Sequence, residues 1–272
     1  MKQRLDQLLF SRGLVPSRSQ AESWIRLGKV YVAGKQTTKP GAMVDTEQDV
    51  ELKADEQYVS RAGLKLASVA KILHLEFANK VMLDVGSSTG GFTDYALKHG
   101  IRKVIAVDVG TNQLHPSLHG DPRIELHEQT DIRNVILAQG AGALREPTRS
   151  SEALATQPAE SELVGGSRVI IEVPDLVVID VSFISLRDIL PHVATLCGPH
   201  TIVAAMVKPQ FEARESNLKH KGVIKNDRMR RDILKDFEQW VTRYFVVLDK
   251  ADSDVAGSKG NRERFYKLRR TA

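Results

Sequence analysis

Short apolar runs alternate with helical patterns through most of this chain. From Lys80 onward the runs are rich in β-branched residues, and the segments between them carry apolar residues at helical spacing. Continuous apolar strands separated by helices are typical of a mostly parallel sheet that is buried on both faces. The pattern therefore predicts an α/β fold with a seven-stranded sheet and helices on both sides. The expected strands are Val81–Val85, Val104–Val109, Ile124–Leu126, Leu176–Val181, Ile202–Val207, Phe245–Leu248 and Phe265–Leu268.

One segment interrupts this alternation. Residues 138–167 are rich in Ala, Gly, Ser, Glu and Pro and contain few large apolar residues. Such a composition provides little apolar surface to bury, so it predicts a mobile loop inserted between the third and fourth strands. A short surface helix is the alternative.

The first 53 residues follow a different pattern. Leucines at helical spacing and an amphipathic segment from Pro16 to Leu27 predict two helices, the second of which ends at Gly28. Short apolar segments at 30–32 and 49–52, with turn residues between them, predict a small hairpin. These residues therefore make a complete α+β module.

A polar stretch separates this module from the rest of the chain. Residues 54–60 are predicted to be a linker, and the segment from Arg61 to Leu73 carries apolar residues at helical spacing. A chain of 272 residues can accommodate two cores. We therefore expect one domain over 1–53 and a second over 61–272.

The composition limits the class of protein. Lys and Arg number 39 against 34 Asp and Glu, and the resulting net charge of +5 favours a polyanionic partner. The single cysteine, Cys197, excludes an internal disulfide, and no Cys/His cluster has the spacing of a metal site. No signal peptide or membrane span is visible, so we expect a cytoplasmic protein that does not enter membranes. The sequence does not indicate an oligomeric state.

A loop rich in small residues follows the first strand of the sheet. Small residues let the backbone approach a ligand closely, and the start of the next helix offers free N–H donors. Dinucleotide-binding enzymes share such loops, but the glycine expected two positions after the first one is absent here, which favours S-adenosylmethionine over NAD. The predicted cofactor-binding residues of this strand, loop and helix start are Asp84, Gly86, Ser87, Ser88, Thr89, Gly90, Gly91 and Phe92.

Two further acids extend this cofactor hypothesis. Asp108 closes the second strand, where a carboxylate can accept both hydroxyls of an adenosine ribose. Asp131 follows the third strand and could meet the edge of the adenine. The alternative is that Asp108 caps a turn and Asp131 caps a helix.

Charged residues also stand where the fourth and fifth strands end. Asp180 closes the fourth strand, beside the crevice in which such sheets bind their ligands, and Lys208 follows the fifth. Methyltransferases of amino groups usually carry an Asn/Asp-Pro-Pro-aromatic turn here, which this chain lacks, and Cys197 is not placed to be a nucleophile. A lysine there can act as a general base toward a hydroxyl, or it can simply bridge to Asp180. Lys65 and Glu263, taken alone, are ordinary surface charges.

Taken together, these motifs resemble the TlyA family, also called hemolysin A, whose catalytic domain is similar to methyltransferases of the FtsJ/RrmJ type. The resemblance covers nearly the whole chain apart from 138–167. It rests on Arg4-Leu5-Asp6, Ser17-Arg18-Ser19-Gln20-Ala21, Tyr58-Val59-Ser60-Arg61, Asp84–Asp94, Asp180-Val181-Ser182-Phe183, Lys208-Pro209-Gln210-Phe211-Glu212 and Gly260-Asn261-x-Glu263.

The resemblance implies a Rossmann-like class I S-adenosylmethionine-dependent methyltransferase behind a module similar to that of ribosomal protein S four. It implies 2′-O-methylation of cytidine in small- or large-subunit ribosomal RNA, with ribosomal subunits as the partner. The family's Lys-Asp-Lys-Glu tetrad falls on Lys65, Asp180, Lys208 and Glu263. Lys208, helped by Lys65, would then handle the 2′-hydroxyl proton.

Basic residues near the N-terminus outnumber the nearby acids and predict contacts with RNA phosphates. The candidates are Arg4, Arg12, Arg18, Arg26, Lys29, Lys35 and Arg61. Alternatives to the enzyme are an inactive RNA-binding or ribosome-assembly factor, a small-molecule methyltransferase, and a hemolysin acting at membranes.

Overall fold

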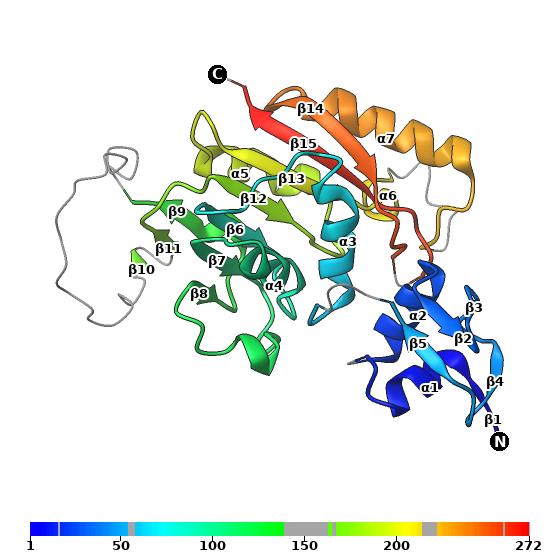
Figure 1. Cartoon of the computed structure of the whole chain (residues 1–272). Helices are drawn as coiled ribbons and strands as arrows, with labels where there is room; N and C mark the ends of the chain where they lie inside the picture. The colour runs from blue at the N-terminus through cyan, green and yellow to red at the C-terminus, as the bar shows by residue number, and fades with distance from the viewer. Residues whose placement is uncertain are drawn as a thin grey trace.

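A seven-stranded sheet forms the centre of the larger part of the protein (Figure 1). The computed structural model describes residues 1–15, 17–53, 58–138, 163–164, 167–213, 222–257 and 259–271. The strand order is β14-β15-β13-β12-β6-β7-β8. The strands are β6 (Val81–Val85), β7 (Lys103–Val107), β8 (Ile124–His127), β12 (Leu176–Ile179), β13 (Ile202–Val207), β14 (Phe245–Asp252) and β15 (Arg264–Arg270).

The predicted mostly parallel sheet is confirmed. β8, β7, β6, β12 and β13 pair in parallel, whereas β15 is antiparallel to both of its neighbours, β13 and β14. The central strands β6 and β12 are buried along their whole length, as expected when helices cover both faces.

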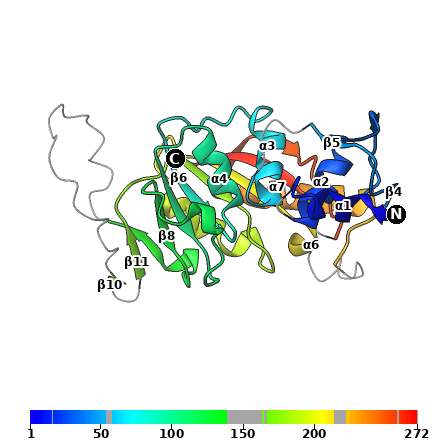
Figure 2. The same ribbon diagram turned by 60° about the horizontal axis from the view of Figure 1, so that its bottom comes forward.

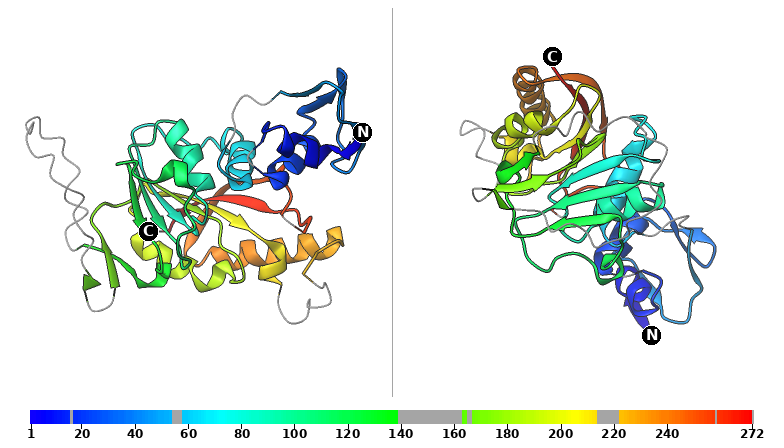
Figure 3. Two further views of the ribbon diagram at one scale, coloured as in Figure 1. Left: turned by 90° about the horizontal axis from the view of Figure 1, so that it is seen from below. Right: turned by 90° about the vertical axis from the view of Figure 1, so that its left-hand side faces the viewer.

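Helices lie on the two faces of this sheet (Figure 3). α3 (Arg61–Ala70) and α4 (Gly91–Lys98) cover one face, and α5 (Leu190–Leu196) and α7 (Asp227–Val241) cover the other. Successive strand residues point to opposite faces, so neighbours along a strand join different apolar clusters. α6 (Pro209–Glu212) directly follows β13 and Lys208.

The ends of several elements differ from the prediction. α3 stops at Ala70 instead of Leu73, because the Leu75 amide donates to the Ala70 carbonyl while His74 adopts a positive φ of 48°. β7 and β12 each end two residues early, where the chain turns into the crevice. β14 and β15 are longer than predicted because they pair with each other over most of their length.

A second, small sheet lies beside the main one and was not predicted. It consists of β9 (Val135–Leu137), β11 (Ser167–Ile170) and β10 (Leu163–Val164), in the order β10-β11-β9. Part of the segment predicted as a loop, 138–167, is therefore strand. The rest of that prediction, 139–162 and 165–166, lies outside the described residues.

The N-terminal module (residues 1–53) contains the predicted helices and hairpin. The Ser17 hydroxyl caps α2 by accepting the Gln20 amide at 3.2 Å, and Gly28 follows the helix with a positive φ of 70°. Sequence patterns did not indicate β1 and β4, which pair with each other. The elements are β1 (Lys2–Arg4), α1 (Leu5–Ser11), α2 (Arg18–Arg26), β2 (Val30–Val32), β3 (Lys35–Gln36), β4 (Met43–Asp45) and β5 (Val50–Leu52).

The module packs beside α3, at the opposite end of the molecule from β10 and β11 (Figures 1 and 2). The Gln20 side chain donates to the Tyr58 carbonyl at 2.6 Å, and the Tyr58 ring lies 5.4 Å from that of Tyr95 in α4. Tyr58, which falls in the predicted linker 54–60, is thus buried, and residues 54–57 lie outside the described part. The domain boundaries themselves stay a prediction.

Candidate active site

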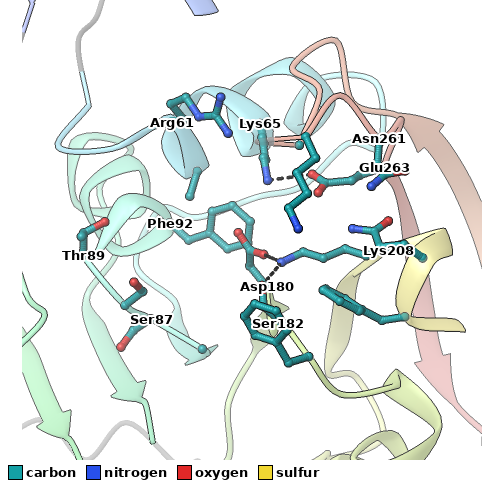
Figure 4. Close-up of a pocket in the computed structure, with 18 of the residues that line it drawn as sticks. Arg61, Lys65, Ser87, Thr89, Phe92, Asp180, Ser182, Lys208, Asn261 and Glu263 are labelled. Atoms are coloured by element: carbon teal, nitrogen blue, oxygen red, sulfur yellow. Dashed lines mark hydrogen bonds and ion pairs between the residues drawn. The ribbon is translucent and has the colours of Figure 1, made fainter. Parts of the chain in front are cut away.

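A cavity of about 500 Å³ opens where β6, β12 and β13 end at their carboxyl sides (Figure 4). The four predicted catalytic residues all line it. Asp180 follows β12 and Lys208 follows β13, because carboxyl ends of neighbouring parallel strands meet at one edge of a sheet. Lys65 comes from α3, and Glu263 directly precedes β15.

Lys208 is held by two oxygens. Its Nζ lies 2.5 Å from Asp180 Oδ1 and donates to Ser182 Oγ at 2.7 Å. Only 7% of Lys208 is exposed. Two acceptors fix two of the three bonding directions of the nitrogen, so its remaining direction is also set.

Lys65 and Glu263 form a second ion pair in the same cavity, with 2.7 Å between Nζ and Oε2. Both residues are buried. Removing one partner of a buried pair leaves an uncompensated charge, so each residue depends on the other. Figure 4 shows this pair and the Lys208 pair facing one another across the cavity.

Asp84 lies at the floor of the cavity and is almost fully buried. Burial raises the pKa of its carboxyl to about 7, and the nearby carboxylates of Asp180 and Asp108 act in the same direction. The Thr93 hydroxyl donates to Oδ2 at 2.7 Å and partly opposes this rise. Oδ1 has no hydrogen-bond partner among the described residues, so it remains free to accept from a ligand.

The predicted cofactor loop divides into two groups. Gly86, Ser87, Ser88, Thr89 and Phe92 line the cavity. At Gly86 φ is +80°, and a Cβ would lie 2.8 Å from the Asp180 carbonyl oxygen, so the close approach of loop and strand requires glycine.

Gly90 and Gly91 do not line the cavity. Gly90 is the N-cap of α4, with φ +82°, and a Cβ there would lie 2.4 Å from a methyl of Leu118. A Cβ at Gly91 would lie 2.2 Å from Ser60 Oγ, where α4 packs against the start of α3. These two glycines serve the turn and the helix packing. The sequence pattern of the loop could not distinguish such glycines from those that contact a ligand.

A second cavity, of about 380 Å³, adjoins the first and shares Asp180 and Ser182 with it. Asp108 and Asp131 both line this second cavity. The Asp108 carboxylate accepts the Ser88 amide at 2.8 Å and the Gly110 amide at 2.7 Å, which holds it at the end of β7.

Asp131 occupies the position that the helix-cap alternative predicts. It accepts the Arg133 amide at the start of the short 3₁₀ helix η2 (Ile132–Asn134) and pairs with the Arg133 guanidinium at 2.6 Å. The Asp131 carboxylate therefore lines the second cavity while it is already paired with the Arg133 guanidinium.

The structure adds Phe183 to the site. Phe183 lines both cavities, is 91% exposed and has a φ of +66°. A left-handed conformation at a bulky residue is strained, and such strain gathers at functional sites. The sequence signal is the Asp-Val-Ser-Phe motif, which by itself does not indicate a role for Ser182 or Phe183.

The loop that carries Phe183 is tied to α6. Glu212 is buried, and it accepts hydrogen bonds from Ser185 Oγ at 2.6 Å and from the Leu186 amide at 2.7 Å. Burial raises the pKa of this carboxyl. Phe211, next to Glu212, packs its ring 5.4 Å from that of Phe183. The loop is therefore fixed relative to Lys208.

Asn261 shapes the wall near Glu263. Its side-chain oxygen accepts the Ile224 amide at 2.8 Å, and its nitrogen donates to the Gly222 carbonyl at 2.9 Å. Asn261 thus joins the segment before α7 to the loop before β15. Its place in the Gly260-Asn261-x-Glu263 motif was the only sequence signal.

The predicted RNA-binding residues lie mostly apart from the cavity. Arg4 and Arg18 both pair with the buried Asp6, at 2.9 and 3.1 Å, although their side chains stay almost half exposed. Burial favours the neutral acid, but hydrogen bonds from these two arginines outweigh it and lower the pKa of Asp6. Arg12 donates to backbone carbonyls of 46 and 48.

The remaining predicted RNA-binding residues differ in position. Lys29 and Lys35 are exposed on the module, as is Arg26. Arg61, at the start of α3, lines the first cavity, which holds the two lysine ion pairs and is called the reaction cavity below. The structure therefore brings Arg61, alone among the seven predicted cations, to the edge of the candidate active site.

Cys197 is not part of the site. It follows α5, is buried, and burial raises the pKa of its thiol to about 12. Within the described ranges, no three His, Cys, Asp or Glu side chains gather in a way that could hold a metal ion. The described helices also include none with the length and apolar character needed to cross a membrane.

Comparison with known families divides the chain in two. Residues 58–270 match the FtsJ-like methyltransferase family, and residues 3–50 match the S4 domain family. The methyltransferase match thus includes every residue of the two ion pairs.

Individual relatives span nearly the whole chain. The 16S/23S rRNA (cytidine-2′-O)-methyltransferase TlyA of Mycobacterium tuberculosis H37Rv is 33% identical, over 98% of this chain and 89% of its own length. Hemolysin A of Brachyspira hyodysenteriae is 32% identical, over 96% of this chain and 97% of its own. A solved structure from Streptococcus thermophilus superposes with a TM-score of 0.64 at 33% identity, covering 99% of this chain and 89% of that one.

Proposed function

Because the chain belongs to the FtsJ-like methyltransferase family, we propose that it methylates the ribose 2′-hydroxyl of cytidine in ribosomal RNA. The observation that carries this proposal is the arrangement of two buried ion pairs, Lys208 with Asp180 and Lys65 with Glu263, in one cavity. Such a cavity offers a lysine to a hydroxyl, and it has no thiolate or Asn-Pro-Pro turn of the kind that base methylation uses.

The cofactor is S-adenosylmethionine, and the residues present fit it. Two adjoining cavities at the glycine loop offer space for its two halves. Asp108 at the end of β7 would accept the ribose hydroxyls of its adenosine, and the unpartnered Asp84 Oδ1 would accept from its cationic amino-acid portion. When bound, it supplies an electrophilic methyl group on a sulfonium sulfur.

Lys208 is the proposed general base. As an amine, its Nζ has two N–H groups for Asp180 and Ser182, and these leave the lone pair to accept the proton of the 2′-hydroxyl. Methyl transfer would join the ribose oxygen to the methyl carbon as the bond of that carbon to the sulfonium sulfur breaks, so that a neutral thioether would leave and Lys208 would hold the proton released by the hydroxyl. Lys65 and Glu263 then orient the ribose from the opposite wall.

Positioning supplies much of the rate in such a displacement. Holding two reactants in line can contribute about 7–11 kcal/mol of the barrier. The Glu212 contacts and the Asn261 contacts fix the loops that carry Ser182 and Glu263. Phe183, exposed and held in a strained conformation, offers a ring on which the base of a splayed nucleotide can stack.

Three observations support ribosomal RNA as the substrate. The M. tuberculosis relative is named for this reaction, an S4 domain stands at the N-terminus, and the chain carries a net charge of +5. The proposed substrate places the reaction in the cytoplasm, within ribosomal subunits.

The test is direct transfer of label. We would incubate the protein with methyl-labelled S-adenosylmethionine and, separately, unmodified small and large ribosomal subunits, and then identify labelled nucleosides. We expect 2′-O-methylcytidine with the wild type, and none with Lys208→Ala. Lys71→Ala is the matched control, because Lys71 is exposed at the far end of α3.

Either of two other results would contradict the proposal. Cofactor binding without label in either subunit would favour an RNA-binding or ribosome-assembly factor. Label in a nucleotide base instead of a ribose would refute the assignment of Lys208 as base toward a hydroxyl.

A further inference from the structure

A third cavity, of about 400 Å³, opens between the N-terminal module and the loop before β15. One wall comes from α2 of the module, and the other from residues 254–257, 259 and 260. Arg61, Gly257 and Lys259 line both this cavity and the reaction cavity. The two cavities are therefore neighbours with a common boundary.

The charges in the third cavity are arranged unevenly. Arg26, Arg61 and Lys259 line it together with Glu22 and Asp254. The two acids do not line the reaction cavity, so among the described residues the charged side chains on the common boundary are those of Arg61 and Lys259. This boundary is cationic, and it adjoins the ion pairs of the reaction cavity.

These cations lack neutralising partners in the part of the chain that the structure describes. No hydrogen bond or ion pair joins Arg26, Arg61 or Lys259 to another described residue. Nearby arginines behave differently, since Arg230 and Arg264 both pair with Asp252 at 2.6–2.7 Å. Unpaired cations that line a cavity between two elements indicate an anion from outside the chain.

The common boundary also contains a glycine, Gly257, which has no side chain to obstruct it. Gly257 packs so closely against the site that a Cβ would lie 2.6 Å from Glu263 Oε1. Without a side chain at this position, nothing projects from residue 257 into the passage between the cavities. Arg61 lies one helical turn before Lys65 on α3, and Figure 4 shows both side chains projecting from that helix.

We propose that Arg61 and Lys259 bind the RNA phosphate adjacent to the methylated ribose, and that the third cavity holds the neighbouring nucleotide, with Arg26 facing its phosphate. This inference rests on the proposed function. A ribose in the reaction cavity carries a phosphate on each side, and the cationic common boundary offers one of these phosphates a place to bind.

Arg61 and Lys259 would bind the phosphate in different ways. The Arg61 guanidinium can bind two phosphate oxygens at once, whereas Lys259 acts as a point charge. Phosphate contacts set the register of a nucleic acid without reading its bases. The two residues would therefore fix which ribose faces Lys208, and leave the choice of base to other contacts.

The experiment compares the salt dependence of methyl transfer in charge-neutral variants. Arg61→Gln, Lys259→Gln and the double variant are assayed with the RNA substrate of the wild type, over a range of KCl concentrations. Lys71→Gln and Arg243→Gln are matched controls. Both are exposed: Lys71 directly follows α3, and Arg243 precedes β14, at the opposite end of the β14–β15 pair from Glu263.

We expect each single variant to raise the KM for RNA roughly tenfold, with kcat nearly retained at saturation. The slope of log(kcat/KM) against log[KCl] should become shallower by about 0.7–0.9 for each lost phosphate contact. Arg61→Lys and Lys259→Arg should keep the wild-type slope, because they keep the charge. The control variants and the affinity for S-adenosylmethionine should not change.

The two proposals fail in different ways. A wild-type protein that transfers no methyl group to ribosomal RNA refutes the proposed function. If the wild type is active, and the Gln variants keep its KM and its salt slope while binding cofactor normally, the phosphate site is refuted. A Gln variant that loses cofactor affinity also overturns the inference, because its residue would then support the cofactor pocket.

Discussion

The Asp84→Asn substitution tests the charge of the buried carboxyl, because it leaves the shape of the side chain nearly unchanged. Asparagine is nearly isosteric, and its side-chain oxygen can still accept the hydrogen bond that Thr93 donates at 2.7 Å. The substitution removes only the ionisable group, whose pKa burial raises to about 7. Two pH-dependent properties of the protein should therefore change.

The first property is stability without cofactor. The carboxyl has an ordinary pKa of 3.8 in the unfolded chain, so between pH 4 and pH 7 the unfolded chain holds fewer protons, and the free energy of unfolding falls as pH rises. The two pKa values differ by about three pH units, so at pH 8 the carboxyl lowers the free energy of unfolding by about 4 kcal/mol. About 3 kcal/mol of this loss is already present at pH 6. The advantage of Asp84→Asn over the wild type in free energy of unfolding should thus grow by about 1 kcal/mol from pH 6 to pH 8.

The second property is affinity for S-adenosylmethionine, which carries a sulfonium and an ammonium group. About a tenth of Asp84 is ionised at pH 6 and about nine tenths at pH 8, so the wild-type Kd should tighten about tenfold over this range. Calorimetric titrations at both pH values measure it, and subtracting the change seen with Asp84→Asn removes the titration of the cofactor itself. Equal pH dependence of Kd in the two proteins, with a constant stability difference in urea, would refute the reasoning.

Three other substitutions test the rest of the site. Glu263→Gln should lower the free energy of unfolding by about 3–5 kcal/mol, because it leaves Lys65 buried without a counter-charge, and a stability in urea equal to the wild type would contradict this. Ser182→Ala should lower kcat roughly tenfold and leave the Kd of the cofactor unchanged, since Lys208 then keeps one anchor, and Ser182→Thr should restore the rate. Phe183→Ala should weaken RNA binding, measured as KM, by about 1–3 kcal/mol, whereas Phe183→Tyr should not; an unchanged KM in the alanine variant would exclude base stacking.

The sequence predicted the main sheet well but missed short strands. Runs such as Val81–Val85 and Ile202–Val207 are long and apolar enough to specify a buried strand locally, and the structure has them with the same bounds. β1, β4 and β9 have three residues each, and β10 has two, too few to show a period. These short strands exist because a partner from another part of the chain pairs with them.

The candidate site likewise contains residues that a local sequence signal predicts and residues that have no such signal. Asp180 and Lys208 were predictable because acids and lysines at strand ends gather at one edge of a parallel sheet. Lys65 and Glu263 had no local signal and entered only through the family resemblance. The structure joins them because the loop before β15 lies beside α3, where the Asp254 amide donates to Ser68 Oγ, and these segments are far apart in the sequence.

By itself, the sequence determined the alternation of strands and helices, the glycine loop after the first strand, and the charged residues at strand ends. Only the tertiary structure decided that Lys208 has two oxygen partners, that Gly90 and Gly91 serve packing, and that Arg61 lies between two cavities without a partner among the described residues. Spacing along a chain encodes which face of an element is buried, because that depends on the local period. The partner of a side chain depends on strand order and register, which are set by contacts between distant segments.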